Sequence, residues 1–295
     1  MQNKIARVSL ALCTLTAPAV AQHADTVLFG EADAAAKSAP LEHHFVHPLT
    51  SPYVHEDSFI TTDLRAWYVM HEFTAGSPIG SGDASVIAVQ ARVALTDRLQ
   101  LVAYKDGYLE IDTPGLDDSG FNNIAAGLKW NFYRDWTTGT HASAGIGYEL
   151  ALGDEEVLQD YDEWRLWLSG NQAFGAMHLG ATFNYFVPGG EEGLFEPAKR
   201  ISWHVHADYR LNDNFSPVLE INGYKTLDDE PGSAPFSGVD VANIGGEGED
   251  VITAGVGGEW RFSERLAARL AYESPLTDNL DLFGYRWTLS LVWGF

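Results

Sequence analysis

The chain has 295 residues and a formal net charge of −23 at neutral pH, from 41 acidic and 18 basic residues. This acidity argues against nucleic acid as a partner, because phosphate binding requires clustered lysine and arginine. No run of roughly 18 apolar residues follows the N-terminal region, so the sequence predicts no transmembrane helix.

The N-terminus has the pattern of a secretory signal peptide. Lys4 and Arg7 precede a short apolar run from Val8 to Thr16, and Ala19 to Ala21 form a small-x-small cleavage sequence. We predict that residues 1–21 are removed by cleavage after Ala21. The only cysteine of the chain, Cys13, lies in this segment, so the mature protein has no disulfide framework.

Residues 22–57 precede the first strand pattern. They begin with a small, polar, non-periodic linker, and residues 41–57 read "LEHHFVHPLTSPYVHED". We predict a periplasmic N-terminal segment, either an extended strap or a segment tucked into the lower mouth of the domain that follows. His43, His44 and His47 are weak metal candidates, but they match no standard ligand spacing, so we predict no bound metal and no cofactor.

From Ser58 onward, apolar and polar residues alternate. In "FGYRWTLSLVWGF", residues 283–295, every second residue is apolar over 13 positions, which is typical of a strand with one greasy and one polar face. Similar segments of about ten residues, the length of a tilted membrane strand, cover residues 59–72, 84–95, 98–111, 123–133, 141–152, 162–171, 176–187, 200–211, 215–225, 251–262, 265–273 and 284–295. We therefore predict an all-β, antiparallel transmembrane barrel of about 12 strands over residues 58–295.

The connections between these segments alternate in length. Short ones such as "TDR", "QAFG" and "NDN" alternate with long acidic ones such as "GDEEVLQDYDE" and "TLDDEPGSAPFSGVDVANIGGEGED". Outer-membrane barrels have short periplasmic turns and long extracellular loops, whereas a soluble β-sandwich has no reason to sort its loops. The acidic loops have carboxylates for divalent cations but lack a calcium-loop spacing, so we favour a solvated surface facing lipopolysaccharide.

The last strand resembles the C-terminal signal of bacterial outer-membrane β-barrels. It ends in an aromatic residue with apolar residues at every second position upstream: Trp287, Leu289, Leu291, Trp293 and Phe295. "LTDRLQLVAY" and "FNNIAAGLKWNF" are similar to phrases of porin-like barrels, nearest to the meta-pathway phenol-degradation type. The resemblance implies a Gram-negative outer-membrane location and recognition of the last strand by the barrel-assembly machinery.

Alternation also predicts which side chains face the lumen. A lysine or arginine on the lipid face costs about 2–4 kcal/mol at the midplane, so charged residues are expected on the inward face. The predicted lumen-lining residues are Arg65, Arg92, Lys129, Glu149, Arg165, His204, His206, Asp208, Arg210, Glu220, Glu259, Arg261, Arg269 and Arg286. They form either a polar channel or a lattice of ion pairs that fills the barrel, and we favour a narrow channel. The register of the third strand is ambiguous, since Lys105 and Asp106 fall on opposite faces and Gly107 suggests a bulge.

Two histidine patterns suggest chemistry. In "ISWHVHADYRL", residues 201–211, His204 and His206 share one strand face, and we interpret them as lumen lining that titrates near neutral pH rather than as metal ligands. His71 with Ser77 or Ser81 is the loose candidate for an outer-membrane lipid hydrolase, but no serine–histidine phrase is present. We therefore predict no enzyme but a channel for passive diffusion of small solutes. A closed structural or adhesive barrel is the alternative, and a lipid hydrolase comes after it.

Overall fold

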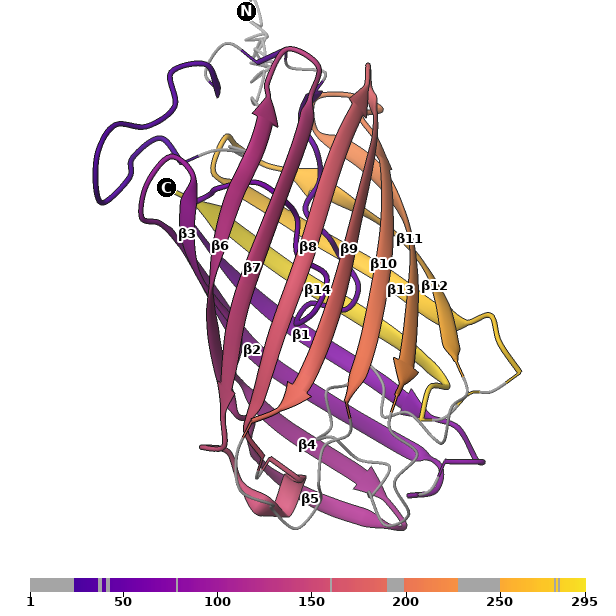
Figure 1. Ribbon diagram of the computed structural model, residues 1–295. Coiled ribbons are helices and arrows are strands. Elements are labelled where there is room, and N and C mark those ends of the chain that lie inside the picture. The colour runs from indigo at the N-terminus through magenta and orange to yellow at the C-terminus, as the bar shows by residue number, and fades with distance from the viewer. Residues whose placement is uncertain are drawn as a thin grey trace, which may run out of the picture.

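A computed structural model describes residues 24–36, 39–40, 43–77, 79–159, 161–189, 199–227, 250–278, 280 and 282–295. The predicted signal peptide and the long acidic loop at residues 228–249 lie outside these residues. The strands form a tilted barrel (Figure 1). They are β1 (Asp63–Phe73), β2 (Gly82–Ala94), β3 (Leu99–Lys105), β4 (Tyr108–Thr113), β5 (Leu116–Phe121), β6 (Ile124–Asp135), β7 (Thr140–Leu150), β8 (Glu163–Phe174), β9 (Met177–Pro188), β10 (Arg200–Tyr209), β11 (Phe215–Thr226), β12 (Val251–Arg261), β13 (Leu266–Pro275) and β14 (Tyr285–Gly294), with the 3-10 turn η3 (Glu155–Val157).

All strand pairs are antiparallel, and the sheet closes because β1 pairs with both β2 and β14. Strands β3 and β4 both pair with β2, so they are two parts of one wall strand. Their partners β6 and β5 are likewise two parts of the next wall strand. The wall therefore has 12 strands, and the predicted fold class is confirmed.

The break within the third wall strand has a local cause. Gly107 has φ +115, and a Cβ at this position would lie 2.5 Å from the carbonyl oxygen of Ile87. Only glycine fits this backbone and this close approach. The register also shifts between Ala103 and Lys105, so Lys105 turns into the barrel, where it is 2% exposed.

The connection between the predicted strand segments 98–111 and 123–133 is not a plain loop. The chain turns at Pro114-Gly115 and continues at once as β5, which pairs with β4 along residues 116–121. The two wall strands therefore extend beyond the other strands at the end of the barrel that carries the long loops (Figure 1). We call this the long-loop end, and the opposite end the short-turn end.

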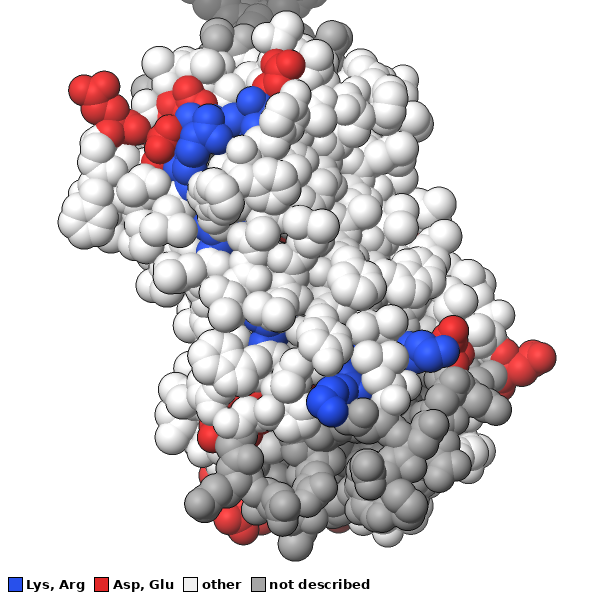
Figure 2. Space-filling model, in the orientation of Figure 1, with Lys and Arg blue, Asp and Glu red and all other residues white. Residues whose placement is uncertain are grey.

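The two faces of the wall differ as the alternation predicts. On β6, Leu128, Trp130 and Phe132 are exposed on the outside, whereas Lys129 and Asn131 are buried inside. Figure 2 shows a mostly uncharged band between charged groups that gather toward the two ends. Such an outer surface is stable only when lipid covers it. Among the described residues, no helix is long and apolar enough to cross a membrane.

The chain between the linker and β1 lies inside the barrel (Figure 1). Every residue from Phe45 to Thr61 is buried except Pro52, which is partly buried. We call residues 45–61 the inner loop. The sequence left two alternatives for residues 41–57, an extended strap or a segment tucked into the lower mouth of the barrel, and residues 45–57 lie inside the barrel.

The inner loop enters and leaves at the short-turn end. Going in, the backbone nitrogen of Val46 donates to Asp208 near the end of β10, and that of Thr50 donates to Glu220 in the middle of β11. The loop turns at Ser51, which has φ 52 and whose carbonyl accepts bonds from Val54 and His55. It then returns to the short-turn end and continues into β1.

Candidate functional site

The predicted lumen-lining residues point into the barrel, with one exception. Thirteen of the fourteen are no more than 3% exposed. Arg210 is the exception, because β10 ends at Tyr209, and its guanidinium instead pairs with exposed Asp213 in the following turn at 2.8 Å. A water-filled channel would leave its lining side chains accessible, so the described interior is packed in this state.

Several inward charges pair with one another along the wall. Glu259 lies between two guanidinium groups, at 3.0 Å from Arg261 and 2.8 Å from Arg269. Lys105 contacts Glu149 at 2.6 Å. Arg286 pairs with Glu273, and Arg65 with Asp63 at 2.8 Å. Each of these ion pairs gives a buried charge a partner of opposite sign, because an unpaired charge in the barrel interior would be costly.

Two other wall cations, Arg92 and Lys129, pair with a carboxylate of the inner loop rather than of the wall. Arg92 donates to both oxygens of Glu56, at 3.2 and 2.7 Å. The Lys129 ammonium donates to the same carboxylate at 2.8 Å and to the Asp57 carbonyl at 3.0 Å. Burial opposes ionisation of Glu56, but the charges of Arg92 and Lys129 outweigh it and lower its pKa to about 2.

The inner loop completes the charge balance of the interior. Among the described residues, nine basic and nine acidic side chains are buried, histidines aside. Glu56 and Asp57 are two of the nine acids and both belong to the inner loop. Without the loop, the described wall has nine buried cations against seven buried carboxylates, a net positive interior. Sequence reasoning missed this role of Glu56 and Asp57, because both lie before the first strand pattern.

The backbone of the inner loop is held by wall side chains. Arg165 donates to the carbonyls of Tyr53 and Val54, both at 2.7 Å. The amide of Asn131 donates to the Ser58 carbonyl at 2.8 Å. None of the backbone-to-backbone bonds described for residues 45–61 joins the loop to a wall strand. The loop is therefore an occupant of the barrel rather than part of its sheet.

The histidines of "ISWHVHADYRL" lie in a buried network. His206 hydrogen-bonds Glu220 at 2.6 Å and Asp208 at 3.1 Å, and Asp208 also bonds His178 at 2.7 Å. His204 bonds the side-chain oxygen of Asn222 at 2.8 Å. All these groups have protein partners, so in this state the histidines fill the barrel rather than line open water.

The inner loop adds histidines of its own to this network. The ring of His55 stacks on His204 with 5.0 Å between centroids, and burial lowers the His55 pKa to about 4, so this ring is neutral. His47 bonds Asp57 across the loop at 2.5 Å. In the part of the chain that the structure describes, no three histidine, cysteine or acidic groups come together as a metal site, including His43, His44 and His47.

A cluster of buried apolar side chains lies inside the barrel toward its long-loop end. Trp67, Val69 and Phe73 on β1 point inward and form a cluster with Leu282 and with Val54 of the inner loop. The sequence analysis did not predict this cluster, because alternation predicts a polar inward face and no apolar residue was assigned to it. This cluster lies beside buried polar groups at the same end, such as the ion pair between Arg200 and Glu163.

The hydrolase candidate is not assembled in the structure. His71 is 2% exposed and points inward, and its Nε2 lies 3.1 Å from the Leu282 carbonyl oxygen. The hydroxyl of Ser77 accepts a bond from the backbone nitrogen of Ile79. No contact between His71 and either Ser77 or Ser81 is present among the described residues, and a lipid hydrolase would need such a pair facing lipid.

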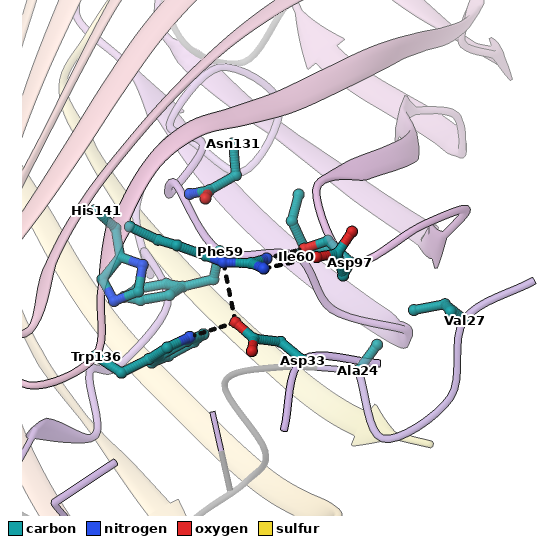
Figure 3. Close-up of a pocket in the computed structure, with 10 residues that line it drawn as sticks. Ala24, Val27, Asp33, Phe59, Ile60, Asp97, Asn131, Trp136 and His141 are labelled. Atoms are coloured by element: carbon teal, nitrogen blue, oxygen red, sulfur yellow. Dashed lines mark hydrogen bonds and ion pairs between the residues drawn. The ribbon is translucent and has the colours of Figure 1, made fainter. Parts of the chain in front are cut away.

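The short-turn end is partly covered by residues 24–36. The backbone nitrogens of Ala24 and Leu28 donate to the carbonyls of Ile60 and Ala94, at 3.0 and 3.1 Å. Asp33 accepts from the Trp136 indole at 2.7 Å and pairs with Arg134 at 2.9 Å (Figure 3). Burial raises the pKa of Asp33, but the hydrogen bonds from Trp136 and Ala35 and the charge of Arg134 lower it below its usual value overall.

A small pocket lies under this cover. Phe59 and Ile60 of the inner loop's return arm line it together with Trp136 and His141, with Asp33 on the outer side (Figure 3). Its interior has room for about one water molecule. It is therefore a small packing gap between residues 24–36 and the barrel rather than a ligand site.

A closed 12-stranded barrel with an apolar outer band and a charged interior is the architecture of a bacterial outer-membrane β-barrel. By fold, the chain is similar to the NanC porin, with TM-score 0.51 and 8% identity over 79% of this chain and 98% of that one. It is also similar to the KdgM porin in complex with disordered oligogalacturonate, with TM-score 0.48 and 9% identity over 79% and 99% of the two chains.

A third similar structure is the translocator domain of the autotransporter NalP from Neisseria meningitidis, with TM-score 0.45 and 10% identity over 80% and 88% of the two chains. At these identities the likeness shows the fold alone. No protein-family model and no curated protein matches the chain. The narrower resemblance to meta-pathway phenol-degradation barrels therefore stays a prediction.

Proposed function

We propose that the protein is an outer-membrane channel for passive diffusion of small solutes and that the inner loop holds it closed in the state described here. The observation that carries this proposal is how the loop is attached. Its polar contacts with the wall are hydrogen bonds and ion pairs that involve side chains, such as Glu56 with Arg92 and Arg165 with Tyr53, and apolar contacts such as those of Val54 accompany them. Water and ions are able to replace such contacts, so the sheet stays closed if the loop leaves.

The same geometry explains how a lumen forms. Both arms of the inner loop reach the short-turn end, so the loop leaves by that mouth without threading any segment through the wall. The polar wall groups that it covers, among them Asn222 and Glu220, then face water. A twelve-stranded barrel lies between eight strands, which side chains fill, and sixteen, which leave an open channel.

The second candidate is a closed structural or adhesive barrel without conductance. The apolar cluster around Trp67 and Phe73 at the long-loop end favours it, as do the wall-to-wall ion pairs. It differs from the channel in one property, because its interior stays packed at all times.

Planar-bilayer recording with the purified full chain distinguishes the two. The channel predicts discrete current steps, with long closed intervals while the inner loop is in place. Absence of steps across a wide voltage range, with a barrel that is folded by its heat-dependent gel mobility, rejects the channel and leaves the closed barrel.

The location and partners of the chain are part of this proposal. We propose export by a cleaved signal peptide and insertion into a Gram-negative outer membrane through the C-terminal strand that ends at Phe295. The long loops then face lipopolysaccharide, and the short turns face the periplasm. Recovery in the outer-membrane fraction, with an N-terminus beginning at Gln22, is the expected result; recovery as a detergent-free soluble protein overturns it.

A further inference from the structure

The Glu56 carboxylate occupies a site that has the composition of an anion-binding site. A planar guanidinium holds both of its oxygens, and an ammonium contacts one of them. Arginine forks of this kind suit carboxylates because two parallel bonds fix the anion plane. Arg92 and Lys129 are 1% and 0% exposed, and both belong to the wall.

These two cations differ from the other paired cations of the wall. Lys105 contacts a wall carboxylate, and so do Arg261 and Arg286. Every acceptor described for Lys129 lies on the inner loop, at Glu56 and Asp57. For Arg92, the nearest described wall carboxylate is Asp63, at 4.0 Å.

We propose that Arg92 and Lys129 form a binding site for small carboxylate anions in the open lumen, and that Glu56 of the inner loop occupies this site in the closed state. The proposal rests on the proposed function, because the site is free only when the loop leaves. Two consequences follow. Carboxylate solutes compete with Glu56 and favour the open state, and the open pore passes anions better than cations.

The charge balance supports the choice of an anion. Withdrawal of the loop removes two carboxylates, Glu56 and Asp57, and leaves more buried cations than buried carboxylates on the described wall. A narrow lumen with low-dielectric walls concentrates ions of the opposite sign. Gln90 lies 3.4 Å from Arg92 and gives the site a neutral hydrogen-bonding partner.

Cysteine labelling tests the competition without relying on current. The full chain carries Val54→Cys on the inner loop, where Val54 is 4% exposed, and Cys13 lies in the predicted signal. A hydrophilic maleimide then reports loop withdrawal. Succinate at about ten times its dissociation constant should raise labelling about tenfold over chloride of equal ionic strength. The response should disappear in Lys129→Met and persist in Lys129→Arg.

A matched control uses the other buried lysine. Lys105→Met removes the same charge at a site that contacts Glu149 of the wall rather than the loop, so the succinate response should persist. Equal labelling in succinate and chloride overturns the proposal, and so does an equal loss of response in Lys105→Met and Lys129→Met.

Reversal potentials in a potassium chloride gradient test the second consequence. The open steps of the native chain should favour chloride, and Lys129→Met should reduce this preference more than Lys105→Met. Cation-selective steps would overturn the proposed anion site and would still support the proposed channel function. Absence of steps rejects the proposed channel, and the labelling result then decides the site independently.

Discussion

Replacing Glu56 with glutamine tests how the inner loop is held. The carboxylate accepts two bonds from Arg92 and one from Lys129, and all three groups are buried. Breaking a buried ion pair by removing one charge costs about 3–5 kcal/mol. Glutamine retains one acceptor oxygen, so we take the lower end, about 3 kcal/mol, which corresponds to roughly a 100-fold increase in loop opening.

Hydrogen exchange followed by mass spectrometry measures this opening directly, because local opening sets the exchange rate of the loop amides. Peptides covering residues 45–61 should exchange roughly 100-fold faster in Glu56→Gln, while strand peptides such as those of β8 keep their rates. Glu149→Gln is the matched control, since this buried carboxylate contacts Lys105 and Asn123 of the wall. A change of less than about threefold in the loop of Glu56→Gln, or an equal change in the control, refutes the reasoning.

Three further predictions address other parts of the molecule. Arg165→Lys loses the fork that binds the carbonyls of Tyr53 and Val54, so exchange at the loop tip should rise about 30-fold for a loss of about 2 kcal/mol; unchanged exchange contradicts this role. Gly107→Ala places a Cβ against the neighbouring strand and should destabilise the barrel by about 2–3 kcal/mol, seen as a lower temperature for loss of heat-dependent gel mobility. Deleting Phe295 should slow folding catalysed by the assembly machinery in liposomes, and an unchanged rate removes the last strand from that role.

The wall was predictable from sequence because its environment repeats every second residue. Lipid outside and polar groups inside impose one alternation on all strands, so Leu128 and Lys129 take opposite faces with no knowledge of their neighbours. The twelve-strand count followed from the same signal. Strand ends were less certain, and Arg210 was assigned to the lumen because the alternation continues one residue beyond the end of β10.

The inner loop was not predictable by the same means. "HHFVHPLTSPYVHED" has no period, and two prolines exclude a regular strand through it. Its position depends on partners more than 100 residues away, such as Asp208 for Val46 and Asn171 for Ser58. The available signal was composition. The segment is rich in histidine and contains large apolar residues, whereas a flexible linker is usually made of small polar residues.

The inner loop contacts both the buried cations of the wall and the apolar cluster at the long-loop end. Its carboxylate-bearing arm neutralises Arg92 and Lys129 in the polar part of the lumen. Its turn places Tyr53 and Val54 in the apolar cluster at the long-loop end. Withdrawal of the loop therefore removes apolar contacts from that cluster at the same moment as it frees the cations. Because one segment contributes to both, our proposal predicts that displacing Glu56 also loosens the long-loop end and that opening is a single cooperative step.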